Sequence, residues 1–275
     1  LCAYSGASAL PIALEGHGRQ ELFEQLDLTR TLGWFTTVYP VQLSAAGEPG
    51  SALPAVKEQL RALPHQGLSH GALLALGPTD ARERLRALPE PQVLFNYLGQ
   101  LDQSLDAEQG LFVPSAESSG DDTDPDLPAA YMFEVNAEIV AGQLRVEWGY
   151  CPALHQTETV RGLVARYEQE LRALIEHCRG QRRSTWTPSD VPLAELDQAA
   201  LCRLSARAGK ADDVYRLTPL QQGMLYHALS TPESDVYVTQ LAVDLRGLDG
   251  AGITQLRAAW QATLDAHESL RTCFT

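Results

Sequence analysis

Glu15-Gly16-His17-Gly18-Arg19, followed by Arg30-Thr31-Leu32-Gly33-Trp34-Phe35-Thr36, is the stretch that decides the fold of this chain. The apolar run Leu10-Pro11-Ile12-Ala13-Leu14 just before it predicts a short buried strand, so Glu15 would leave the end of that strand. Glycine on both sides of His17 lets the chain turn sharply and lets a ligand approach the backbone. On these residues alone, Glu15 is either a functional carboxylate or a structural ion-pair partner for Arg19 or Arg30.

Four motifs in the first 100 residues occur in the order of one known family. The two quoted stretches resemble the Glu-Gly-His-Gly-Arg-Glu and Arg-Thr-Val-Gly-Trp-Phe-Thr motifs of the epimerization domains of nonribosomal peptide synthetases, and depart from them at Gln20 and Leu32. Residues 64–71 are similar to that family's Pro-x-x-Gly-x-Gly-Tyr-Gly motif, with departures at Ser69 and His70. Phe95-Asn96-Tyr97-Leu98-Gly99 matches its Phe-Asn-Tyr-Leu-Gly motif without change.

The end of the chain resembles a different domain of the same synthetases. Residues 215–225 are similar to the opening motif of a condensation domain, and residues 266–274 to its second motif, with Ala266 in place of arginine. The His-His-x-x-x-Asp-Gly motif of these families does not occur in the 275 residues. The resemblance therefore implies a piece of a longer synthetase. It comprises the second lobe of an epimerization domain (1–190), a closing tail and linker (191–213) and a truncated first lobe of a condensation domain (214–275).

The fold that this resemblance implies is a mixed α/β (α+β) fold like that of chloramphenicol acetyltransferase, here incomplete, in which two lobes form a V with a tunnel between them. The residue patterns agree with such a fold. They predict helices at 51–62, 158–178, 219–229 and 252–267, strands at 93–98 and 236–245, a hairpin at 131–150 and a polar loop at 103–129.

The chemistry that the resemblance implies is inversion of the Cα of an aminoacyl or peptidyl thioester, from L to D, by proton transfer on two sides. One group is a histidine of the first lobe and the other a glutamate that matches Glu15. Burial in a tunnel should raise the pKa of this carboxyl from about 4.3 towards neutrality. Asn96 and Tyr97 could donate hydrogen bonds to the thioester oxygen, or could be a backbone clamp and a core residue. His17 could orient Glu15 or serve packing alone.

Composition excludes several classes of function. Lys plus Arg number 21 against 35 Asp plus Glu, a net charge of −14, which disfavours nucleic acid as a partner. No apolar run approaches the length of a membrane span, no leader is visible, and the five scattered cysteines lack metal-ligand spacing. We therefore expect a cytoplasmic protein without a directly bound cofactor or metal.

The expected partners follow from the resemblance. They are neighbouring synthetase domains and a peptidyl carrier protein, which presents the substrate on its 4'-phosphopantetheine arm. The alternative function is a non-catalytic interdomain segment that docks carrier proteins between modules.

Overall fold

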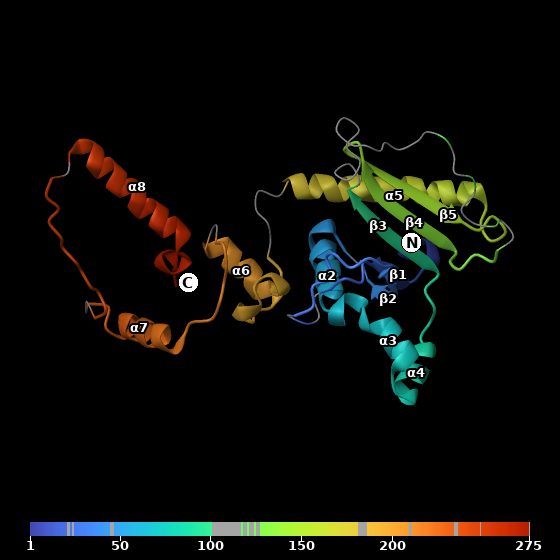
Figure 1. The fold of residues 1–275 in the computed structure, drawn as a ribbon, viewed down its shortest axis with the longest axis horizontal. Coiled ribbons are helices and arrows are strands. Elements are labelled where there is room, and N and C mark those ends of the chain that lie inside the picture. The colour runs from blue at the N-terminus through green and yellow to red at the C-terminus, as the bar shows by residue number, and fades with distance from the viewer. Residues whose placement is uncertain are drawn as a thin grey trace. The chain divides into compact units, whose positions relative to one another are not determined.

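Two compact units make up the computed structural model, Leu1–Ser184 and Thr185–Thr275 (Figure 1). Each unit is described by itself below. The structure describes residues 1–20, 23, 25–44, 47–100, 117, 120, 124, 127–180, 186–208, 211–233, 236–247 and 249–274.

The first unit is built on a mixed five-stranded sheet with the strand order β2-β1-β3-β4-β5. Neighbouring strands β1, β3 and β4 run parallel, and the outer strands β2 and β5 pair antiparallel with β1 and β4. The strands predicted at 10–14 and 93–98 and the hairpin predicted at 131–150 are confirmed, and one strand of this sheet, β2, was not predicted. The strands are β1 (Leu10–Gly16), β2 (Thr37–Leu43), β3 (Val93–Gln100), β4 (Phe133–Val140) and β5 (Gln143–Tyr150).

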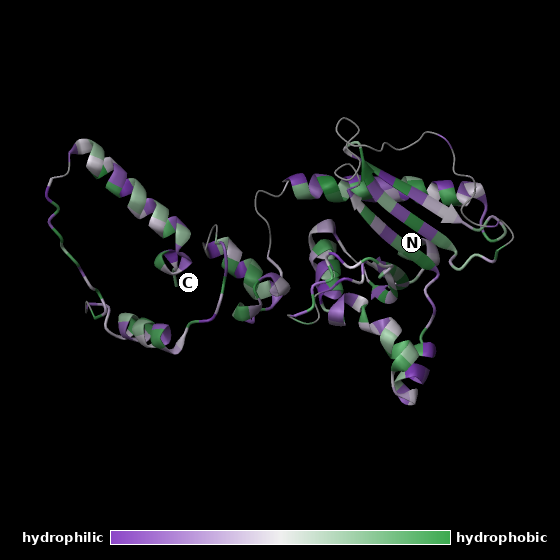
Figure 2. Ribbon diagram, in the orientation of Figure 1, coloured by the Kyte–Doolittle hydropathy of each residue, from purple (hydrophilic) through white to green (hydrophobic). Residues whose placement is uncertain are grey.

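One face of this sheet packs against helix α5 (Thr157–Gly180), which confirms the helix predicted at 158–178. Alternate residues of β4 are buried there, as the period of two in a strand requires, and Figure 2 shows the same alternation as bands of opposite hydropathy along the strands. Val93, Phe133 and Val160 form the buried centre of this core. The Trp148 ring meets Phe133 and Tyr167 edge-on, with centroids 6.0 and 5.7 Å apart.

Helix α4 (Thr79–Arg86) contacts α3 (Ser69–Leu76), α3 contacts strand β2, and α2 (Pro49–Arg61) contacts strand β2 and helix α5. The helix predicted at 51–62 is confirmed as α2, which contacts both of these elements. Its approach to α5 is close, because a Cβ added at Gly50 would lie 3.1 Å from Cε1 of His177. The loop predicted at 103–129 lies mostly outside the described residues. The helices are α1 (Cys2–Ser5), α2 (Pro49–Arg61), η1 (Pro64–Gly67), α3 (Ser69–Leu76) and α4 (Thr79–Arg86).

The second unit has a small core of Val191, Ala194 and Leu201, with Trp186 and Val214 packed against it. Its predicted helices are confirmed as α7 and α8. The elements are η2 (Pro188–Asp190), η3 (Pro192–Ala194), α6 (Gln198–Ala208), α7 (Pro219–Ser230), α8 (Gly250–Ala266) and η4 (Glu268–Arg271).

The strand predicted at 236–245 is wrong for this structure. The alternating apolar residues are there, but no ladder forms, and the side chains of Leu241 and Val243 are exposed. A strand is stabilised by a neighbour that takes up its backbone hydrogen bonds and covers its apolar face. Among the described residues, no strand pairs with this segment.

Helices long and apolar enough to span a bilayer are absent from the described part of the chain.

Candidate functional site

Glu15 and Asn96 lie side by side at the carboxyl ends of two neighbouring parallel strands. The register pairs Ala13 with Leu94 and Leu14 with Phe95. Glu15 on β1 and Asn96 on β3 each follow the second of these pairs, so they lie at matching positions of the two strands. Parallel strands are about 4.8 Å apart, which brings the two side chains within reach of one small ligand. Both residues are half-buried. The pairing joins two motifs that are separated by about 80 residues of sequence.

Glu15 and Asn96 point away from the α5 core. Leu14 and Phe95 share the core face of the sheet, and successive residues of a strand alternate between its faces. The face that carries Glu15 is polar on β4, where Glu134 and Asn136 are exposed. This side of the sheet, which we call the polar face, therefore presents a carboxylate and an amide together.

Tyr97 is not brought to this site. It follows Asn96 on the strand and is paired with the buried residue Ala137, so it belongs to the opposite face. It is 53% exposed there. The expectation that Asn96 and Tyr97 donate to the same oxygen therefore does not fit the strand geometry, although Asn96 alone does.

The loop after Glu15 is held in place by the second part of the motif. Gly18 is buried with φ of +67°, and an added Cβ would lie 1.6 Å from the carbonyl oxygen of Phe35. The Arg19 guanidinium donates from Nη1 to the carbonyl oxygen of Leu28 (2.6 Å) and from Nη2 to that of Gly33 (3.2 Å). It also lies over the Phe35 ring, 4.3 Å from its centroid. The two halves of the motif thus contact each other, and we call their described residues, 17–20 and 25–36, the Gly18 loop.

These contacts engage the Arg19 guanidinium with backbone carbonyls, away from the Glu15 carboxylate. Among the described residues, neither Arg19 nor the exposed Arg30 forms an ion pair with Glu15, because Arg19 binds backbone carbonyls instead. The interpretation of Glu15 as a structural partner of an arginine is therefore not supported. The side chain of His17 serves the turn, since its Nδ1 accepts a hydrogen bond from the backbone N–H of Arg19 at 3.0 Å.

Tyr131 is a residue of this region that the sequence reasoning missed. Burial raises the pKa of its phenol, and the carboxylates of Glu134, Glu15 and Glu90 raise it further. The phenol therefore lies within electrostatic reach of Glu15. No motif contains Tyr131, so only the folded structure could reveal this proximity.

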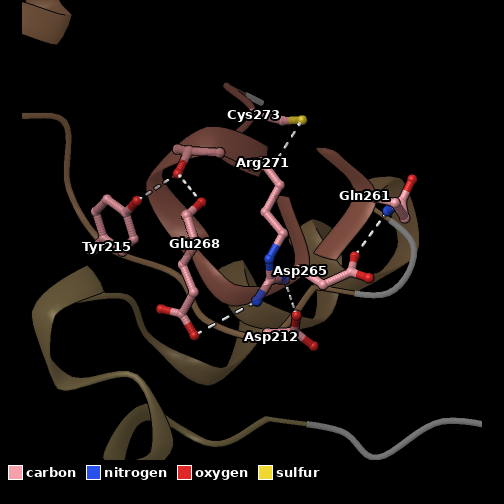
Figure 3. A network of polar contacts seen from close by, with 8 residues as sticks. Asp212, Tyr215, Gln261, Asp265, Glu268, Arg271 and Cys273 are labelled. Atoms are coloured by element: carbon pink, nitrogen blue, oxygen red, sulfur yellow. Dashed lines mark hydrogen bonds and ion pairs between the residues drawn. The ribbon is translucent and has the colours of Figure 1, made fainter. Parts of the chain in front are cut away.

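The condensation-like motif near the end of the chain makes structural contacts (Figure 3). The Arg271 guanidinium binds the carboxylate of Asp212 and lies 3.7 Å from that of Glu268. The hydroxyls of Tyr215 and Thr272 are 2.9 Å apart. These contacts tie the motif to the segment that precedes α7, so Arg271 has a structural role in this unit.

Metal-binding groups of three or more His, Cys, Asp or Glu residues do not occur in the part of the chain that the structure describes.

Comparison with known families agrees with the motifs. A family model described as the condensation domain matches residues 1–196 and 211–275. The chain belongs to the condensation-domain family. This family member is 41% identical over 274 residues to one of the linear gramicidin synthase polypeptides of Brevibacillus parabrevis, and 33% identical over 271 residues to bacitracin synthase 3 of Bacillus licheniformis. These matches cover 98% and 97% of the chain but only 4% of either relative.

A solved structure supports the same assignment. The condensation-family chain is similar to the epimerization domain from the third module of tyrocidine synthetase B, with a TM-score of 0.58 and 30% identity. The similarity covers 66% of this chain and 40% of that domain. The predicted mixed α/β fold of condensation and epimerization domains is thereby confirmed, as is the resemblance to nonribosomal peptide synthetases.

Proposed function

We propose that residues 1–190 carry one half of an epimerization site, which inverts the Cα of an aminoacyl or peptidyl thioester held on a carrier protein. Residues 214–275 would begin the condensation domain that follows it. The similarity to an epimerization domain and the motif order support this assignment. The site would act on the thioester at the end of the carrier protein's 4'-phosphopantetheine arm.

The observation that carries the proposal is the Glu15 carboxylate on the polar face, beside Asn96 and without an arginine partner among the described residues. A carboxylate paired with an arginine would be a poor base, because the pair favours its charged form. A carboxylate that has no ion-pair partner among the described residues, at the strand end just before the Gly18 loop, is placed to accept a proton.

The reaction divides into two proton transfers. Glu15 accepts the Cα proton, and the electron pair of the broken C–H bond moves into the enolate of the thioester. A group on the opposite side of the substrate then delivers a proton to Cα, which re-forms the C–H bond with inverted configuration. By the resemblance, this second group is a histidine of the other lobe. In the reverse direction the two groups exchange roles.

Asn96 is suited to stabilise the enolate. Its side-chain N–H groups are donors. Asn96 is on β3, whose backbone is about 4.8 Å from that of β1, the strand that carries Glu15. A donor aimed at the oxygen where charge develops stabilises the transition state more than the ground state.

The experiment is Glu15→Gln in the longer synthetase to which we propose this chain belongs. The amide keeps the size of the carboxylate but cannot carry a proton, so inversion should fall about a hundredfold or more. Glu15→Asp should also be impaired, since its shorter side chain withdraws the carboxylate by about an ångström. Glu138→Gln is the control. It removes one carboxylate from the polar face at another strand, β4, and should leave the rate unchanged. Inversion at the wild-type rate by Glu15→Gln would remove Glu15 from the chemistry, whereas carrier binding without any inversion by the wild type would favour the non-catalytic docking function.

A further inference from the structure

Asn136 lies directly across from Asn96 on the polar face of the sheet. The two residues are register partners on the parallel strands β3 and β4, so their side chains project to the same side. Glu15 occupies the next strand on the other side of Asn96. A carboxylate and two carboxamides thus form one row across three adjacent strands. The sequence motifs contain the first two of these residues and not Asn136.

An ordinary solvent-exposed strand face does not account well for this pair. Asparagine is depleted in strands, and here two of them face each other on strands that each have neighbours on both sides. The exposed face of β4 already carries Glu134 and Glu138, two residues before and two residues after Asn136. These glutamates already make this face of β4 polar. The two asparagines add hydrogen-bonding groups in the same row across the strands as Glu15.

We propose that Asn136 binds a secondary amide of the substrate, one strand beyond the reacting centre. The inference rests on the proposed role of Glu15. Adjacent strands are about 4.8 Å apart, so β4, which carries Asn136, is about 10 Å from β1, which carries Glu15. A substrate that lies across the strands, with its Cα at Glu15 and its thioester carbonyl at Asn96, would bring the next amide group to Asn136.

The chemistry of the side chain fits such a group. A secondary amide offers one N–H donor and one carbonyl acceptor, and a carboxamide can both accept and donate. In this arrangement the amide beyond the thioester carbonyl is the first one of the carrier arm, because the upstream peptide bond leaves Cα on the side away from that carbonyl. Aminoacyl and dipeptidyl substrates both contain this carrier-arm amide.

The experiment compares Asn136→Ala with wild type in the same longer synthetase, using an aminoacyl and a dipeptidyl thioester on the carrier protein. Loss of one such hydrogen-bonding group should raise KM about tenfold, with kcat changed by less than about twofold. A rise with both substrates supports binding of the carrier-arm amide by Asn136. A rise with the dipeptidyl substrate alone would contradict it, because the two substrates differ only upstream of the reacting residue.

Two control variants separate binding from folding. Asn136→Val substitutes a good strand former that has no hydrogen-bonding group, so it should keep the unfolding midpoint and still raise KM. Glu138→Gln, on the same strand and face, should change neither quantity.

An unchanged KM with both substrates would overturn the inference, as would a KM rise in Asn136→Ala that Asn136→Val restores to the wild-type value. The Glu15→Gln variant distinguishes the two proposals. If it abolishes inversion while Asn136→Ala behaves as wild type, the inference fails and the proposed function stands. If it inverts normally, the proposed function fails.

Discussion

Among glycine-to-alanine substitutions in the Gly18 loop, Gly18→Ala should destabilise the loop most. Gly18 has φ of +67°, a region that L-residues seldom adopt, and the added Cβ would lie 1.6 Å from the Phe35 carbonyl oxygen. Since that oxygen belongs to the backbone, the clash can be relieved only by moving the chain.

The magnitude follows from two contributions. Alanine in the left-handed region costs about 1–2 kcal/mol, and displacement of the packed backbone adds about 1–3 kcal/mol. We therefore expect Gly18→Ala to lower the free energy of unfolding by about 2–5 kcal/mol. Gly142, in the β4–β5 turn, is the matched control, because its φ is +69° and an added Cβ would have no neighbouring atom within 4 Å. Gly142→Ala should cost only about 1–2 kcal/mol.

The assay is urea unfolding of both variants followed by circular dichroism, with hydrogen exchange at the β1 amides as a local readout. The midpoint of Gly18→Ala should lie about 1 M below that of Gly142→Ala, and its β1 amides should exchange faster. Equal midpoints and equal exchange in the two variants would refute the argument that contact between Gly18 and Phe35 holds the loop.

Three further predictions test other parts of the structure. Arg19→Lys should speed amide exchange in residues 25–36, because lysine cannot reach two carbonyls as a guanidinium does, whereas Arg172→Lys, at an exposed ion pair, should not. Burial raises the pKa of Tyr167, so the folded state holds this proton more tightly than the unfolded state. Stability should fall as pH rises above about 10, and less in Tyr167→Phe, as urea midpoints at about pH 8 and about pH 10.5 would show. Finally, the 275-residue chain alone should not exchange the Cα proton of a carrier-bound aminoacyl thioester, since the His-His-x-x-x-Asp-Gly motif does not occur in it. Exchange above a carrier-only control would contradict this.

The strongest periodic patterns were enough to predict much of the fold. The apolar stripe at 158–178 predicted α5, and the two alternating runs at 131–150 predicted the β4–β5 hairpin, because each pattern repeats long enough to fit one period. Strand β2 was missed. Pro40 lies inside it, and a proline argues against a strand unless that strand is at the edge of a sheet, which is where the topology places β2.

The site could be predicted only in part. Glu15 and Asn96 were found because both lie in family motifs, but their adjacency depends on parallel pairing of β1 and β3, which no local pattern encodes. The position of Tyr97 could have been predicted, since alternation along a strand separates it from Asn96. Tyr131 and Asn136 could not, because their relation to Glu15 and Asn96 exists only in the assembled sheet.

The most direct test of the central claim follows deuterium at Cα in heavy water, with Glu15→Gln and each substrate enantiomer in turn. If Glu15 is one of two proton-transfer groups, the variant should still exchange the Cα proton of the enantiomer served by the opposite group, without inverting it. The other enantiomer should neither exchange nor invert. Inversion of both enantiomers by folded Glu15→Gln at near wild-type rates would contradict the account and remove Glu15 from the chemistry.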